Sequence, residues 1–87
     1  MVEDGDLVAI FHSIHRVMKA EKILKAQRAD ILLIPVPRKL SSDCGLAIRI
    51  AADGFEAVWR LLVEAGLRPQ ELYRSCGDDF VSLELPE

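Results

Sequence analysis

The order of apolar runs along the 87 residues is the feature that most restricts the fold. Short runs of β-forming residues occur at 7–11, 31–34, 46–50 and 72–75. Two stretches with helical spacing of apolar residues separate them, the first at 14–27 and the second between Asp53 and Gly66. This β-α-β-β-α-β order is typical of the ferredoxin-like sandwich. We therefore predict an α+β fold, with a four-stranded antiparallel sheet and two helices on one face.

Local signals place the ends of these elements. Ser13 is predicted to cap the first helix, and Asp53 with Glu56 three residues on is predicted to cap the second. Gly66 stands where a left-handed residue would end the second helix. Residues 80–85 alternate and predict a fifth strand or a docked tail. We expect one ferredoxin-like domain over 1–87, with its core at about 7–75 and a C-terminal strand or tail at 78–87.

Composition excludes several classes of function. With a formal net charge of −3, the chain lacks the basic balance expected of a nucleic-acid-binding protein. No apolar stretch reaches the roughly 18–20 residues needed to cross a membrane. The acidic N-terminus does not resemble a signal peptide, so we expect a cytoplasmic protein whose two cysteines are free thiols. The spacing of histidines and cysteines predicts no metal site, and nothing in the sequence indicates a cofactor.

The expected sheet carries a prediction about the ends of its strands. We expect the first and third strands to run side by side and parallel at the centre, flanked by the other two. Cys44 and Cys76 would then lie at the same end of the sheet, about 10 Å apart. His12 and His15 would lie at the opposite end, which argues against a Cys–His pair or a shared zinc site. The same arrangement leaves no helix N-terminus at the cysteine end.

The loop between the second and third strands is the candidate site. Pro35 and Pro37 cannot donate to a β-ladder and are expected to stop strand pairing there. A thiolate is the reactive form of cysteine, and neighbouring cations and hydrogen-bond donors stabilise it. The candidate residues are the thiol Cys44 and its expected surroundings, Arg38, Lys39, Ser41, Ser42 and Gly45.

The chain also resembles a known family. The residues that carry the resemblance are His12-Ser13, Ala20-Glu21-Lys22, Ile34-Pro35-Val36-Pro37-Arg38, Ser41-Ser42 and Cys44-Gly45-Leu46-Ala47. They resemble the small bacterial family of Se/S carrier-like proteins, over roughly residues 7–75. The resemblance implies a bacterial protein that carries sulfur or selenium on Cys44, by analogy with sulfur-carrier proteins, whose cysteine holds a persulfide. The sequence departs from the family pattern at the end of the first helix, because Gln27-Arg28-Ala29 stands in place of the usual glycine.

Three functional hypotheses follow. The leading one is a carrier, rather than an enzyme that turns over a small molecule, with donor and acceptor proteins as its partners. The second is a non-catalytic binding or dimerisation module that associates as a homodimer through the helix-free sheet face, with Cys44 only closing a turn. The third is a redox switch between Cys44 and Cys76. Otherwise Cys76 is an incidental residue on an exposed turn.

Overall fold

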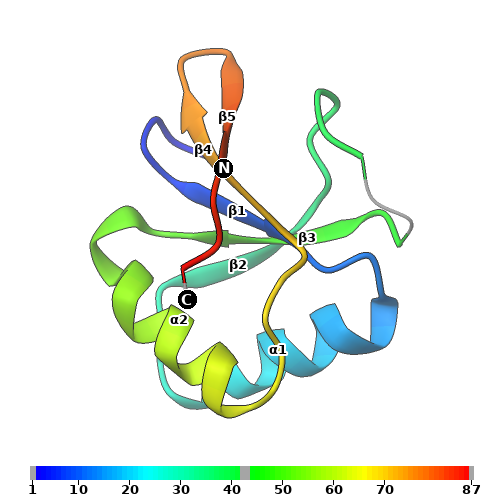
Figure 1. Cartoon of the computed structure of the whole chain (residues 1–87), viewed down its shortest axis with the longest axis vertical. Coiled ribbons are helices and arrows are strands. Elements are labelled where there is room, and N and C mark those ends of the chain that lie inside the picture. The colour runs from blue at the N-terminus through cyan, green and yellow to red at the C-terminus, as the bar shows by residue number, and fades with distance from the viewer. Residues whose placement is uncertain (1, 42–43, 87) are drawn as a thin grey trace.

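The computed structural model describes residues 2–41 and 44–86. Its elements follow the predicted order, with a short 3₁₀ turn and a fifth strand added: β1 (Leu7–Ile10), α1 (Ile14–Ala26), β2 (Ile31–Pro35), β3 (Leu46–Ile50), η1 (Ala52–Gly54), α2 (Phe55–Glu64), β4 (Glu71–Cys76) and β5 (Asp79–Leu83). Both helices lie on the same side of the sheet (Figure 1). The fold is thus the expected ferredoxin-like α+β sandwich, and the segment predicted as a strand or a tail forms β5.

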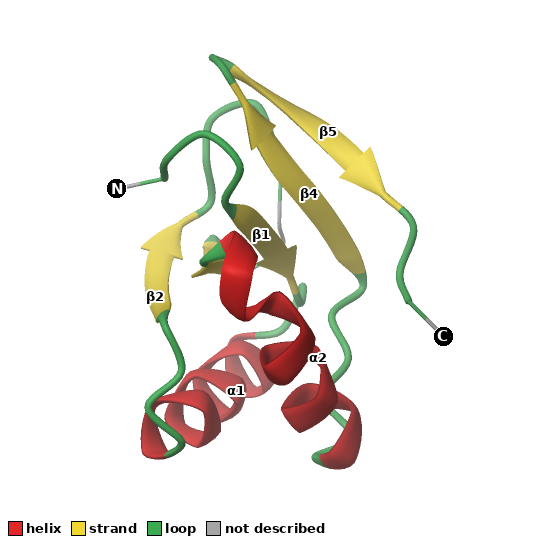
Figure 2. Ribbon diagram, turned by 90° about the vertical axis from the view of Figure 1, so that its left-hand side faces the viewer, coloured by secondary structure: helices red, strands yellow, loops and turns green. Residues whose placement is uncertain are grey.

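The five strands lie in the order β2-β3-β1-β4-β5, and every neighbouring pair is antiparallel. The predicted parallel pairing of the first and third strands is therefore wrong. Helix α1 returns the chain so that β2 runs in the same direction as β1. The hairpin from β2 then reverses the direction of β3, which inserts between them. Figure 2 shows the β4–β5 hairpin projecting beyond the rest of the sheet.

Each face of the sheet buries its own cluster of apolar side chains. The larger cluster packs against the helices and includes Leu7, Ala9 and Phe11 from the N-terminal part of the chain. The smaller one lies on the helix-free face and consists of Val8, Ile10, Ile34 and Ala47. Its cover comes from partly buried side chains of this same chain: Val2, Val36, Leu40, Tyr73 and Phe80. Val36 and Leu40 of the loop after β2 thus cover part of the helix-free face together with Phe80 of β5.

The helix ends show which local signals were read correctly. Ser13 caps α1, because its hydroxyl accepts a hydrogen bond from the Arg16 amide at 3.3 Å. Gly66 has the expected left-handed φ of 69° after α2. The prediction for Asp53 is wrong, because this residue lies inside η1 and α2 begins only after Gly54, with no side-chain cap.

At the end of α1, Arg28 occupies the left-handed position that a glycine usually takes, with φ of 59°. The Arg28 amide bonds to the Lys25 carbonyl and the Ala29 amide to the Leu24 carbonyl, each at 3.0 Å. These two bonds form a Schellman motif. The helix therefore ends as it would with glycine, but with a side chain in a strained conformation.

Candidate functional site

Cys44 lies two residues before β3 and continues the row of β3 side chains that face the helices. Leu46, Ile48 and Ile50 belong to this row, and Cys44 packs against the same helix-side cluster. The side chain is half-buried, and its S–H donates a hydrogen bond to the Leu46 carbonyl oxygen at 3.5 Å. Packing against this cluster and the bond to Leu46 thus hold the thiol at one end of the sheet.

The loop that presents Cys44 is closed by backbone hydrogen bonds. The Val36 amide donates to the Gly45 carbonyl at 3.0 Å, so pairing of β2 with β3 continues one residue beyond Pro35. A turn follows in which the Leu40 amide donates to the Pro37 carbonyl at 2.9 Å. Gly45 has φ of 74°, a conformation that suits glycine. Pro35 itself pairs within β2, whose outer edge is open and needs no donor from a proline.

The other predicted loop residues are distributed around this turn. Arg38, Lys39 and Ser41 are exposed. Arg38 lines an open groove of about 340 Å³ next to Val2 and Phe80, which belong to the helix-free face. Cys44, in contrast, packs on the helix side. Ser42 lies outside the described residues.

The two cysteines lie at opposite ends of the sheet, so the prediction that they share one end is wrong. Ile10 of β1 pairs with Ala47, near the start of β3, and with Glu71, the first residue of β4. Cys76 is the last residue of β4 and pairs with Asp79 in the exposed hairpin to β5. The antiparallel direction of β3 moves its beginning, and Cys44 with it, to the other end.

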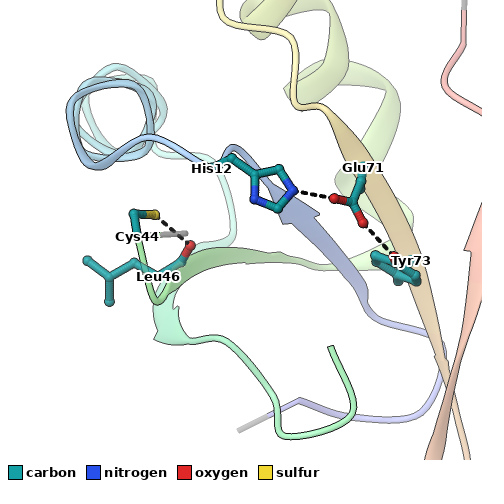
Figure 3. Close-up of polar contacts among 5 residues, drawn as sticks. All are labelled: His12, Cys44, Leu46, Glu71 and Tyr73. Atoms are coloured by element: carbon teal, nitrogen blue, oxygen red, sulfur yellow. Dashed lines mark hydrogen bonds and ion pairs between the residues drawn. The ribbon is translucent and has the colours of Figure 1, made fainter. Parts of the chain in front are cut away.

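His12 lies at the Cys44 end of the sheet, which corrects a second prediction. It follows the C-terminal end of β1, the end that pairs with the start of β3. Helix α1 begins directly afterwards with Ser13 as its cap, so a helix N-terminus also lies at this end. Figure 3 shows the Cys44 sulfur directed to the side on which the His12 ring lies.

His12 belongs to a hydrogen-bonded chain of three side chains. Its Nε2 contacts the Glu71 carboxylate, and the Tyr73 hydroxyl donates to the other Glu71 oxygen at 2.6 Å (Figure 3). Glu71 and Tyr73 are two residues apart on β4 and so point to the same face. The hydrogen bonds from Tyr73 and His12 lower the pKa of Glu71, which remains a carboxylate at neutral pH. The bond to this carboxylate raises the pKa of Tyr73.

The backbone of His12 is itself unusual. Its φ of 58° lies in the left-handed region, which few non-glycine residues adopt. Such conformations cost on the order of 1–3 kcal/mol and are concentrated at functional sites. Sequence reasoning placed His12 at a strand end but did not connect it to Glu71, 59 positions away. The only sequence signal for this hydrogen-bonded group of three side chains was that Glu71 and Tyr73 are two residues apart within a strand.

Among the described residues, no group of three or more histidine, cysteine or acidic side chains is arranged to hold a metal ion. Across residues 2–41 and 44–86, no helix has both the length and the apolar character needed to span a bilayer.

Comparison with protein families gives a match over most of the chain. The sequence model of the family described as "Putative Se/S carrier protein-like" matches residues 6–74. This range contains the elements from β1 to most of β4 and the loop that carries Cys44. It also contains the three hydrogen-bonded residues His12, Glu71 and Tyr73. Searches of curated proteins and of solved structures returned no match.

Proposed function

Since the chain belongs to the Se/S carrier protein-like family, we propose that Cys44 carries a sulfur or selenium atom between two proteins. The donor is an enzyme that bears the atom on a cysteine, and the acceptor is a protein that consumes it. The protein then acts as a carrier, not as an enzyme that turns over a small molecule. The exchange belongs in the cytoplasm, where thiols are kept reduced.

The transfer is a balanced exchange of one atom. The Cys44 thiol loses its proton, and the thiolate attacks the outer sulfur of the donor's persulfide. A new S–S bond forms on Cys44 while the donor's S–S bond breaks, and the electron pair leaves with the donor's inner sulfur. That thiolate takes up the proton. The atom moves at constant oxidation state, so no external oxidant or reductant is needed, and selenium follows the same scheme.

The observation that carries this proposal is the position of Cys44. The thiol is half-buried at the end of a strand, in a loop held by the Val36–Gly45 hydrogen bond, and it lies within the family match. The protein core thus fixes the sulfur, while the loop beside it is exposed. That combination suits a sulfur that must be reached by a partner protein and then protected from solvent.

The remaining loop residues have supporting roles in the proposal. Gly45 allows the left-handed backbone after Cys44. Arg38 and Lys39 are exposed cations that attract the anionic persulfide of the donor. Ser41 and Ser42 supply hydroxyl groups for the terminal sulfur.

The test is intact-mass analysis after incubation with a cysteine desulfurase and cysteine. Wild type, Cys44→Ser and Cys76→Ser are compared. The proposal requires a mass increase of one sulfur atom that is lost in Cys44→Ser and retained in Cys76→Ser. If wild type gains no mass, or if Cys44→Ser gains as much as wild type, the carrier role of Cys44 is refuted.

The rival hypothesis, a dimerisation module, rested on an uncovered sheet face. Val36, Leu40 and Phe80 cover much of that face in this chain, while Leu32 remains 39% exposed on it. Association through this face stays a prediction. Light scattering at high dilution tests it, and a monomeric mass would remove it.

A further inference from the structure

We propose that His12 is the proton acceptor for the Cys44 thiol, and that Glu71 and Tyr73 are positioning residues that hold the imidazole in the required tautomer. This inference rests on the proposed function in one respect, because it takes Cys44 as the reacting thiol. The residues come from three places in the chain: the end of β1, the loop before β3 and the start of β4. The antiparallel register brings all three to one end of the sheet.

The hydrogen bond to Glu71 decides which nitrogen of His12 can accept a proton. A carboxylate only accepts hydrogen bonds, so Nε2 carries the hydrogen and donates it to Glu71. In the neutral ring the acceptor is then Nδ1. Figure 3 shows Nδ1 on the side of the ring that faces Cys44. In that view the edge of the ring that is bonded to Glu71 lies away from the Cys44 side chain, and the Nδ1 edge lies on the side of Cys44.

The Glu71 carboxylate also lies against the ring that would receive the proton. Proton transfer to Nδ1 would form an ion pair between the imidazolium and the ionised carboxylate. Tyr73 in turn donates a 2.6 Å hydrogen bond that keeps Glu71 ionised and fixes its orientation. The His12 side chain is only 21% exposed and that of Glu71 38%, so solvent screens this pair incompletely.

Among the described residues, few titratable or charged side chains lie at the end of the sheet that carries His12 and Cys44. Glu71 and Tyr73 face His12 from β4. His15, on the first turn of α1, is exposed, as are Arg38 and Lys39 in the loop. Of the two histidines at this end, His12 is partly buried and His15 faces solvent.

With this assignment the exchange can be written proton by proton. The Cys44 S–H, which in the resting structure donates to the Leu46 carbonyl, transfers its proton to Nδ1 of His12. The thiolate attacks the outer sulfur of the donor's persulfide, and the donor's inner sulfur departs as a thiolate. The His12 imidazolium returns the proton to that departing thiolate. His12 ends as it began, bonded to Glu71.

The experiment measures how fast iodoacetamide alkylates Cys44 as a function of pH, by intact mass. A Cys76→Ser background leaves one thiol to report. The variant is His12→Asn, because asparagine tolerates the left-handed backbone but has no titrating nitrogen. His15→Asn is the matched control, since it removes the exposed histidine of the same end. Glu71→Gln tests the positioning role without removing the imidazole.

We expect His12→Asn to slow alkylation at pH 7 by about tenfold or more, and the rates to converge above about pH 9, where hydroxide deprotonates any thiol. His15→Asn should match the background at every pH, and Glu71→Gln should show a smaller loss of the same kind. Equal rates for His12→Asn and His15→Asn at pH 7 would overturn the proposal. So would a loss that persists unchanged at high pH, because that would indicate a structural role.

This readout separates the two proposals. Alkylation requires only the thiol, so it reports on His12 even if a desulfurase transfers no sulfur to Cys44. Conversely, sulfur transfer at normal rate by His12→Asn would leave the carrier role standing and remove the role of His12. Circular dichroism of each variant checks the fold, and if His12→Asn does not fold, Glu71→Gln alone decides the outcome by its pH profile.

Discussion

Oxidation of the native protein should not join Cys44 to Cys76. We extend the pairing of β1 with β3 and β4 and count positions along β1. Cys44 then lies opposite the position three residues beyond Ile10, and Cys76 lies opposite the position two residues before Leu7. At about 3.3 Å per residue this offset of eight residues is about 26 Å along the strands, and two strand spacings of about 4.8 Å add to it sideways. A disulfide requires Cα atoms within about 7 Å. The separation exceeds that limit more than threefold.

The assay is treatment of dilute, folded protein with diamide, followed by non-reducing intact-mass analysis. We expect the monomer to retain the mass of two free thiols and any oxidised product to be a dimer through the exposed Cys76. Concentrated guanidinium is the positive control, because the unfolded chain can bring the two sulfurs together. Cys76→Ser should abolish both products.

A monomer that lacks two hydrogens under native conditions, and whose formation needs both cysteines, would refute the reasoning. It would mean that the two ends of the sheet meet in solution, which the antiparallel register of β3, β1 and β4 does not allow. The redox-switch hypothesis would then return. Without that product, the redox-switch hypothesis is excluded.

Three further changes have outcomes that follow from single contacts. Arg28→Gly should raise the free energy of unfolding by about 0.5–1 kcal/mol, or the melting temperature by about 2–8 °C, because glycine adopts the left-handed backbone conformation without strain. Arg28→Ala should bring no such gain. A lower melting temperature for the glycine variant would contradict the Schellman assignment. Tyr73→Phe removes the main cause of the lowered pKa of Glu71, whose stabilisation is present above the unfolded value of 4.5 and lost as pH falls through the folded one. Its acid-unfolding midpoint should therefore move to higher pH, at a cost below about 1 kcal/mol because Glu71 is 38% exposed, and an unchanged midpoint would count against the bond. Leu40→Ala should cost about 1–2 kcal/mol in urea unfolding, since Leu40 covers the helix-free face, whereas exposed Lys39→Ala should be neutral; equal stabilities would show that the loop does not shield the sheet.

Most of the fold could be predicted because its signals are local. The period of apolar residues located the strands and helices, the Ser13 hydroxyl marked the start of α1, and Gly66 marked the end of α2. Asp53 had the right chemistry for a cap, but the chain forms a 3₁₀ turn around it. Such a choice depends on how the preceding strand enters the helix, which residue type does not reveal.

The direction of β3 was predicted wrongly, although the order of elements determines it. A helix crossover leaves β2 parallel to β1, and a hairpin then reverses β3, so β3 must be antiparallel to β1 in this order of elements. Assigning it the opposite direction placed Cys44 at the same end of the sheet as Cys76 and at the opposite end from His12. The contact of His12 with Glu71 is a different case. It depends on register between strands distant in sequence, for which a single sequence carries no local signal.

Some residues of the loop before β3 serve packing, and Cys44 is the one that packing does not explain. Val36 and Leu40 pack on the helix-free cluster, while Cys44 and Leu46 pack on the helix-side cluster, so the loop passes around the end of the sheet from one core to the other. That path accounts for its length and its prolines without reference to chemistry. It does not account for the thiol, because any small apolar side chain could fill the half-buried position of Cys44. The core does not require a cysteine there, at the same end as a histidine with a left-handed backbone and an ionised carboxylate partner, whereas the proposed carrier role would use one.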